Sequence, residues 1–286
     1  MKLLLFSVAL LILTGCNILN PKEQDPSFVF IDSYSFQPLS NQGSSSTAIT
    51  ELWNYANDDI QGVFDLPSQV PVLRTGRNKY SVYAGIKNNG IGSTRIRYPF
   101  YTVYDTILDL QPLQSYRISP VFRYHSAAQV DASRDFEGGN FFQSGPNNGA
   151  TIEVINNPAL AVDGARFGKT TLTPPLNYMN FIDDTNIIMQ AGNTIFLEMN
   201  YSCNNTFIVG MFTIENGDTR KNPVIYLTPT TTDNGETPTW KKIYIDLGVV
   251  AGENPNANYH RLYIECISNE TSSPVVFLDN IKIVNW

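Results

Sequence analysis

Short runs of strand-forming residues, each ended by a cluster of polar turn residues, constrain the fold of this chain more than any other feature. The clearest series occupies the second half, at residues 194–203, 206–213, 224–228, 240–247, 261–267 and 275–284. Turn clusters rich in Asn, Gly and Asp separate several of these runs, at 216–218, 233–235 and 252–255. Strands at regular spacing with polar turns between them are typical of β-sandwiches and jelly rolls. Only residues 183–190 offer a short helix.

The composition favours the same class of fold. Charged residues make up 16% of the chain, against about 25% in a typical globular protein. Short polar residues and tyrosine take their place, and together with 19 Gly and 17 Pro they favour strands and turns over helices. At about 150 residues per domain, a chain of 286 residues suggests two domains. We therefore predict an all-β fold of two β-sandwich domains, the second of them a jelly roll.

The charge of the chain excludes one class of partner. The formal net charge is −7 at pH 7. The densest basic stretches, 74–77 and 95–97, hold two arginines each. A nucleic-acid-binding domain normally gathers Lys and Arg on one face. We therefore expect no nucleic-acid partner.

The N-terminus has the pattern of an export signal. Lys2 precedes an apolar run over residues 3–13, which is broken only by Ser7 and is too short to span a bilayer as a helix. It ends in Leu-Thr-Gly-Cys at Cys16. This ending resembles the lipobox of bacterial lipoproteins. The resemblance implies that residues 1–15 are a cleaved signal peptide and that Cys16 carries the lipid. The alternative is an ordinary secretory signal with an incidental cysteine.

Anchoring through acyl chains becomes stable once two or more are attached. After Cys16, residues 16–27 are largely polar and are expected to form a flexible tether. Asn17, rather than Asp, follows the predicted lipidated cysteine, which by resemblance to known retention rules favours sorting to the outer membrane. We expect a lipid-anchored protein of the cell envelope, at the periplasmic face of the outer membrane or at the cell surface.

The first predicted domain covers residues 28–125. Within it, the run 53–62, the Leu-Pro pair ending at Pro67, and Gly76 ahead of the run 80–82 follow one another. This arrangement resembles PEGA-type and carboxypeptidase-regulatory-like β-sandwiches. The resemblance implies a small structural or surface module without chemistry. Residues 126–134 are polar and are predicted to form a linker.

The second predicted domain, residues 135–286, has a resemblance of its own. Asp-Phe-Glu-Gly-Gly at 135–139, the run 240–247 and Phe-Leu-Asp-Asn-Ile at 277–281 resemble a galactose-binding-like jelly roll, a pattern shared by many carbohydrate-binding modules. The resemblance implies a structural calcium ion between the first and last strands, at three acidic residues: Asp135, Glu137 and Asp279. Carboxylates and backbone carbonyls at adjacent strand ends suit calcium. The alternative is that these acids are turn or surface residues.

Sugar binding needs an aromatic surface with polar groups around it, and four aromatic residues of the second domain are candidates: Tyr178, Trp240, Tyr244 and Tyr263. Alternation along 240–247 puts Trp240, Lys242 and Tyr244 on one face of the strand and Ile243, Ile245 and Leu247 on the core side. We take Trp240, Tyr244 and Tyr178 as the predicted ligand-binding residues. The alternative is that these aromatic rings pack under loops or against the other domain.

The two remaining cysteines, Cys203 and Cys266, each follow the apolar face of a predicted strand. Both should point into the core of the second domain. An oxidising envelope permits a disulfide between them, and two unpaired buried thiols fit the pattern equally well.

Catalytic patterns are absent from the sequence. Its two histidines, His125 and His260, fall in different predicted regions, and no nucleophile elbow or zinc-ligand spacing accompanies them. We therefore predict a non-catalytic envelope lipoprotein that binds a glycan or a protein partner through its jelly roll. The alternatives are a structural or accessory subunit of an outer-membrane complex and, second, a carbohydrate-active enzyme.

Overall fold

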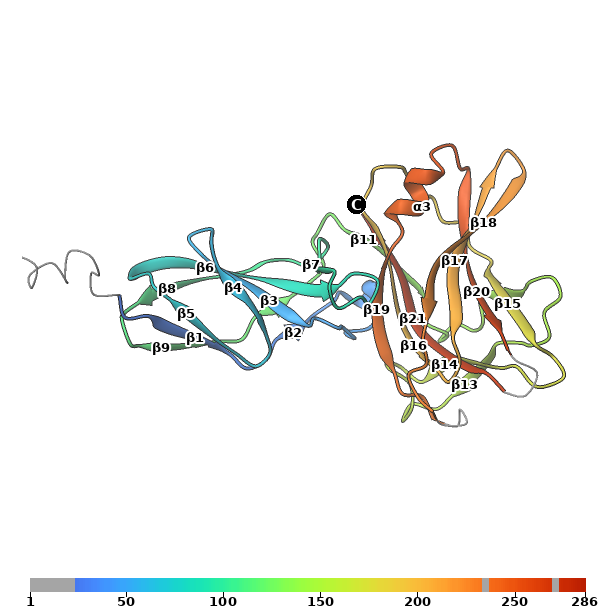
Figure 1. The fold of residues 1–286 in the computed structure, drawn as a ribbon, viewed down its shortest axis with the longest axis horizontal. Helices are drawn as coiled ribbons and strands as arrows, with labels where there is room; N and C mark the ends of the chain where they lie inside the picture. The colour runs from blue at the N-terminus through green and yellow to red at the C-terminus, as the bar shows by residue number, and fades with distance from the viewer. Residues whose placement is uncertain (1–23, 233–236, 269–272) are drawn as a thin grey trace, which may run out of the picture.

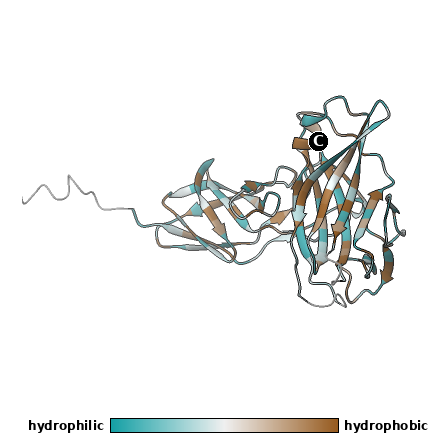
Figure 2. Cartoon of the chain, turned by 45° about the vertical axis from the view of Figure 1, so that its right-hand side comes forward, coloured by the Kyte–Doolittle hydropathy of each residue, from teal (hydrophilic) through white to brown (hydrophobic). Residues whose placement is uncertain are grey.

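The computed structural model describes residues 24–232, 237–268 and 273–286, and it consists of two β-sandwiches arranged end to end (Figure 1). The predicted all-β fold of two sandwiches is confirmed. Within the described residues the only longer helical segment is α3 (Gly248–Glu253), beside the short 3-10 turn η1 (Ser40–Gln42). Hydrophobic and hydrophilic residues alternate along many of the strands, as Figure 2 shows.

The first sandwich packs a three-stranded sheet in the order β5–β1–β9 against a five-stranded sheet. In the larger sheet the order is β4–β3–β6–β7, and β8 also pairs with β6. A short pair, β10–β2, adjoins them. The strands of this unit are β1 (Ser27–Ile31), β2 (Ser35–Phe36), β3 (Glu51–Ala56), β4 (Asp59–Asp65), β5 (Ser68–Val72), β6 (Gly76–Lys87), β7 (Arg95–Arg97), β8 (Tyr104–Leu110), β9 (Ser115–Ile118) and β10 (Val121–Phe122).

The predicted turn at 57–59 joins β3 to β4. Asn57 and Asp58 have φ angles of 47° and 65°, in the left-handed region. A two-residue hairpin turn of type I′ has positive φ at both central positions, and Asn and Asp tolerate that conformation better than most residues. The local sequence therefore sets the register between these two strands.

The second sandwich packs a six-stranded sheet against a five-stranded sheet. The first has the order β13–β14–β21–β16–β19, with β11 also paired to β21, and the second has the order β12–β15–β20–β17–β18. Its strands are β11 (Gln129–Arg134), β12 (Phe142–Ser144), β13 (Glu153–Asn156), β14 (Arg166–Thr171), β15 (Tyr178–Asp183), β16 (Ile195–Cys203), β17 (Phe207–Glu215), β18 (Asp218–Leu227), β19 (Lys241–Asp246), β20 (Tyr259–Ile267) and β21 (Val275–Asn285).

The core of the second sandwich lies between these two sheets. Ile243, Ile245 and Leu247 are buried in it, so the predicted core side of strand β19 is confirmed. Strands β16 and β21 at the centre of the larger sheet are buried almost throughout. Burial on both faces follows because one face meets the core and part of the other meets the first sandwich.

Two local predictions are wrong. The predicted linker 126–134 contains strand β11, whose residues pair with the C-terminal half of β21, so the second sandwich begins earlier than residue 135. The short helix considered at 183–190 is absent: Asp183 is the last residue of β15, and its Oδ1 accepts a hydrogen bond from the Thr185 amide at 2.9 Å. Asp183 also pairs with the buried Arg134, which ties the end of β15 to β11.

The two sandwiches share a continuous hydrophobic contact. Phe196, Tyr244 and Val284 of the second sandwich belong to the buried cluster of the first. The rings of Tyr98 and Phe196 lie 5.3 Å apart, and the Asn89 amide donates to the Tyr244 carbonyl at 2.9 Å. The junction is therefore a packed interface.

Within the described residues, no helix is long and apolar enough to cross a membrane. The predicted signal peptide and the lipidation site Cys16 lie outside the described residues.

Candidate functional site

Tyr244 lies at the junction between the sandwiches and is only 1% exposed. Its hydroxyl accepts a hydrogen bond from the Ala48 amide at 3.1 Å and lies 3.0 Å from the Tyr101 hydroxyl. The predicted outward-facing platform is therefore wrong for Tyr244. Its side chain does point away from the core, as the alternation requires, but the first sandwich covers that face.

Trp240 is half-buried in a small hydrophobic cluster. Its ring packs edge-on against Phe167 at 5.7 Å and near Phe277 at 6.3 Å, and its Nε1 donates to the Leu160 carbonyl at 2.7 Å. This arrangement matches the alternative interpretation that the ring packs under a loop.

Tyr178 begins β15, on the outer face of the five-stranded sheet of the second sandwich. Its hydroxyl donates to Glu265 Oε2 at 2.7 Å, and burial together with that carboxylate raises the pKa of Tyr178 to about 12. The same carboxylate forms an ion pair with Lys221 and accepts from Asn180 Nδ2 at 3.3 Å. The outer face of this sheet therefore carries a cluster of polar groups.

Tyr263, the fourth aromatic candidate, occupies the middle of the same face, because β20 lies at the centre of the sheet. Its ring lies across Gly210 of β17, where a Cβ atom would come within 2.4 Å of the tyrosine ring. The ring packs against Phe212 at 4.8 Å, and Lys221 Nζ lies 5.0 Å from its centroid. Tyr263 is fully buried, and its hydroxyl has no hydrogen-bond partner. Gly210 therefore lets an aromatic ring lie flat on the sheet.

A hollow of about 320 Å³ opens on this face next to the polar cluster. Its walls are mostly apolar, with Phe212, Tyr259 and Ile182 among them. Arg261 contributes the one guanidinium, which is held by Asn186 Oδ1 at 3.0 Å and lies 5.6 Å from the Tyr259 ring. An apolar and aromatic floor with a few fixed polar groups is the usual make-up of a small-molecule site.

The residues that form this hollow were not selected from the sequence. They come from β15, β17, β18 and β20 and, at Pro146, from the segment after β12. Pairing across strands brings them together: Phe212 pairs with Arg261 and with Lys221. The available signal was the alternation Ile208, Gly210, Phe212 in β17, with glycine between two large apolar side chains. Alternation identifies the face of a strand but not its partner strands.

Asp279, one of the three predicted calcium ligands, is fully buried in β21. Its Oδ2 accepts from the Val162 amide at 3.0 Å, whereas its Oδ1 has no hydrogen-bond partner. Burial, with the negative charges of Glu137 and Asp163 nearby, raises the pKa of Asp279 to about 7. A buried carboxylate with acidic neighbours and no cation is costly.

Glu137 and Asp135 lie at the start of the loop that faces Asp279. Glu137 Oε1 accepts from the Ala165 and Arg166 amides, both at 2.7 Å, and Asp135 Oδ1 accepts from the Glu137 amide at 3.0 Å. In the part of the chain that the structure describes, no three His, Cys, Asp or Glu side chains form a group that could hold a metal. A calcium ion here would need backbone carbonyls in addition to Glu137 and Asp279.

Cys203 and Cys266 are both buried and both free, so of the two possibilities left open by the sequence the structure has the two unpaired thiols. Cys203 ends β16 in one sheet and Cys266 lies on β20 in the other. Each thiol is within reach of a backbone carbonyl at 3.4 Å, that of Thr228 for Cys203 and that of Thr206 for Cys266. Burial raises the pKa of Cys203 to about 11.

Comparison with known proteins finds solved structures of similar fold but assigns the chain to no family. No protein-family model matches the chain, and no curated protein matches it. A carbohydrate-binding module of the β-sandwich superfamily, described as promiscuous in specificity, is similar over 91% of this chain and 98% of its own, at 15% identity and a TM-score of 0.41.

Two further modules are similar over about half of this chain. The family 11 carbohydrate-binding module of the cellulosomal cellulase Lic26A-Cel5E of Clostridium thermocellum matches 56% of this chain and 97% of its own, at 15% identity and a TM-score of 0.38. A module specific for non-crystalline cellulose matches 52% of this chain and 90% of its own, at 12% identity and a TM-score of 0.37. Likeness at this level carries nothing about a ligand, which has to be argued from the side chains.

Proposed function

We propose that the protein binds a glycan on the outer face of the sheet β12–β15–β20–β17–β18. The observation that carries the proposal is the hollow of about 320 Å³ walled by Phe212 and Tyr259, with Arg261 at its side. The C–H face of a sugar ring can pack on these aromatic side chains, and its hydroxyl groups can pair with the guanidinium. Tyr178, Lys221 and Glu265 extend the polar surface beside the hollow.

The chemistry of the hollow supports binding rather than cleavage. Glycoside hydrolysis uses two carboxyl groups on either side of the scissile bond. None of the described residues that line the hollow is an acid. The nearby Glu265 is engaged by Tyr178, Asn180 and Lys221, which leaves it suited to orient polar groups.

A glycan array followed by calorimetric titration of the best oligosaccharide tests this proposal. Phe212→Ala and Tyr259→Ala should each weaken binding at least tenfold, because each removes an aromatic wall. Tyr83→Ala removes a comparable half-buried tyrosine from the outer face of the first sandwich, so it serves as the matched control and should leave affinity unchanged. Absence of any glycan ligand, or equal losses in all three variants, would contradict the proposal.

The glycan site would be held at the cell envelope through a lipid on Cys16. The lipobox-like ending of the apolar leader supports this part of the proposal, and two or more acyl chains would suffice for stable attachment. Mass spectrometry of the mature protein should find residues 1–15 removed and a diacyl or triacyl mass on Cys16, both lost in Cys16→Ala. An unmodified cysteine thiol would refute the anchor without affecting the glycan site.

A structural calcium ion at Asp279 and Glu137 is a second element of the proposal. The unpartnered Oδ1 of the buried Asp279 supports it, since a cation there would neutralise the carboxylate. Bound calcium would tie the 137–139 region to β21, near the end of the domain. Calcium should raise the melting temperature of the chelator-treated protein by several degrees, and the rise should vanish in Asp279→Asn. An unchanged melting temperature would rule the ion out.

A further inference from the structure

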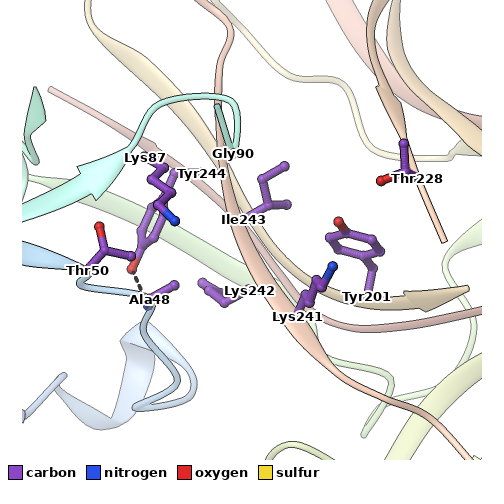
Figure 3. A pocket seen from close by; sticks show the side chains of 10 residues that line it. All are labelled: Ala48, Thr50, Lys87, Gly90, Tyr201, Thr228, Lys241, Lys242, Ile243 and Tyr244. Carbon is purple, nitrogen blue, oxygen red and sulfur yellow. Dashed lines mark hydrogen bonds between the residues drawn. The ribbon is translucent and has the colours of Figure 1, made fainter. Parts of the chain in front are cut away.

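A second hollow, of about 410 Å³, lies at the junction between the two sandwiches, away from the proposed glycan face. Figure 3 shows side chains of the first sandwich, Thr50 and Lys87 among them, on one side. Lys241 and Tyr201 of the second sandwich lie on the other. Its volume falls within the roughly 300–1,000 Å³ of small-molecule sites. Two domains therefore build one site.

The lining of this junction hollow is rich in positive charge. Lys87 comes from the end of β6, and Lys241 and Lys242 open β19. Lys242 forms an ion pair, because its Nζ lies 3.0 Å from Oε2 of the buried Glu198. Across residues 24–232, 237–268 and 273–286, neither Lys87 nor Lys241 forms an ion pair. Two ammonium groups thus face the hollow without an acidic partner.

A fourth lysine lies buried next to this lining. Lys282 lies buried behind Lys242, and its Nζ donates to the Ser44 carbonyl at 2.8 Å. Burial and the Lys242 charge lower the pKa of Lys282 to about 7. On the first sandwich, the buried Glu51 carboxylate accepts a hydrogen bond from the Thr50 hydroxyl and lies 3.4 Å from Arg95. At this junction four lysines, Lys87, Lys241, Lys242 and Lys282, lie near two carboxylates, those of Glu51 and Glu198.

Hydroxyl groups complete the lining. Thr50 lies on the side of the first sandwich, while Tyr201 and Thr228 lie on the far side of Lys241 (Figure 3). A simple inorganic anion would use the ammonium groups alone and leave most of the volume to water. A ligand with one acidic group and several hydroxyls would use both kinds of lining group.

We propose that the junction hollow binds a sugar acid of monosaccharide size, with its carboxylate between Lys87 and Lys241 and its hydroxyls toward Tyr201 and Thr228. This site is independent of the glycan face. A bound acid would bridge lysines from different sandwiches, so the ligand would also fix the two domains to each other.

Calorimetric titration of the full-length protein with galacturonate tests this site, with galactose and inorganic phosphate as comparison ligands. Galacturonate should bind, galactose should not, and the double variant Lys87→Gln, Lys241→Gln should weaken galacturonate at least tenfold. The matched control is Lys79→Gln, Lys169→Gln, which removes one lysine from each sandwich at other places and should leave affinity unchanged.

Several outcomes would overturn the proposal. Phosphate binding as tightly as galacturonate would identify a site for simple anions. If the control double variant weakened galacturonate binding equally, the effect would come from the overall charge of the protein and not from this hollow. Loss of galacturonate binding in Phe212→Ala, with Lys87→Gln, Lys241→Gln unaffected, would place the acid on the outer sheet face and leave the glycan proposal standing.

Discussion

Two buried carboxylates on neighbouring strands of the same sheet, Glu198 and Asp279, have opposite electrostatic surroundings and opposite pKa shifts. Glu198 on β16 accepts from the Tyr98 and Tyr124 hydroxyls at 2.8 and 2.9 Å and pairs with Lys242. Burial alone would raise its pKa, but the Lys242 and Lys282 charges and the Tyr98 hydroxyl lower it overall. Asp279 on β21 has acidic neighbours, and its pKa rises.

The two carboxylates differ in the partners that the protein supplies to them. Glu198 sits where the two sandwiches meet, so both supply partners for it. Asp279 faces the loop that carries Asp163, and the backbone amide of Val162 is the donor to its Oδ2. The cost of burying a carboxylate has to be offset by a partner. Oε2 of Glu198 therefore has a cationic partner at 3.0 Å, whereas Oδ1 of Asp279 has no hydrogen-bond partner.

The largest effect is expected from Glu198→Ala. Removal of this carboxylate leaves Lys242 and the Tyr98 and Tyr124 hydroxyls buried without their acceptor. Breaking a buried pair in this way typically costs about 3–5 kcal/mol. Urea unfolding at pH 7 should show a loss of that size, and Glu153→Ala, at an exposed position of β13, should show almost none. A loss below about 1 kcal/mol would mean that the junction does not depend on this charge.

Asp279 should give the next largest effect, with a defined pH dependence. Its pKa of about 7 in the fold lies above the ordinary value of 3.8. Between these values the folded state holds the extra proton, so the free energy of unfolding falls as the pH rises from about 4 to about 7. The loss by pH 7 is on the order of 3 kcal/mol.

The measurement is urea unfolding of the chelator-treated protein and of Asp279→Asn across this pH range. The difference between the two should grow in favour of the variant as the pH rises, because Asn is neutral throughout. Asp109→Asn, on the exposed side of β8, controls for the change in net charge. Parallel curves for all three proteins would show that Asp279 is already ionised and satisfied.

The sequence patterns predicted toward which face of a strand a side chain points, but they did not predict what covers that face. Alternation in β19 correctly separated Ile243 and Ile245 from Tyr244, yet it could not reveal that the first sandwich covers Tyr244. Which face of a sheet meets another domain depends on contacts far apart in the sequence, and period-two reasoning contains no such information. Phe212 and Arg261 were missed for the same reason, since strand order brings them together.

The calcium site stays a prediction. Resemblance drew attention to Glu137 and Asp279, and the structure places them near each other. Asp163 was missed because it lies in a loop, where no periodicity reports which strand end the loop returns to. The sequence left a disulfide and two free thiols equally open, because a shared core does not fix the distance between two sulfur atoms. The structure has two free thiols.

Lys282 should affect the free energy of unfolding less than Asp279 does, and the pH dependence should have the opposite sign. Its pKa of about 7 in the fold lies below the ordinary 10.5, so between these values the unfolded chain holds the extra proton. The free energy of unfolding should therefore rise between pH 7 and pH 9, by about 2 kcal/mol. Lys282→Met should abolish the rise in urea unfolding experiments, while Lys79→Met, at an exposed ion pair, should retain it. A rise that persists in Lys282→Met would assign it to another group.

The smallest effect should come from a charge that is satisfied at the surface. Arg97 lies 4.8 Å from the Tyr83 ring and 5.8 and 5.9 Å from the rings of Tyr55 and Trp53, on the outer face of the first sandwich. Exposed cation–π contacts contribute about 0.5–1 kcal/mol. Arg97→Ala should cost no more than this in urea unfolding, and Arg97→Lys should recover part of it. A cost approaching that of Glu198→Ala would undermine the contrast, because it would show that exposed and buried charges of this protein stabilise the fold alike.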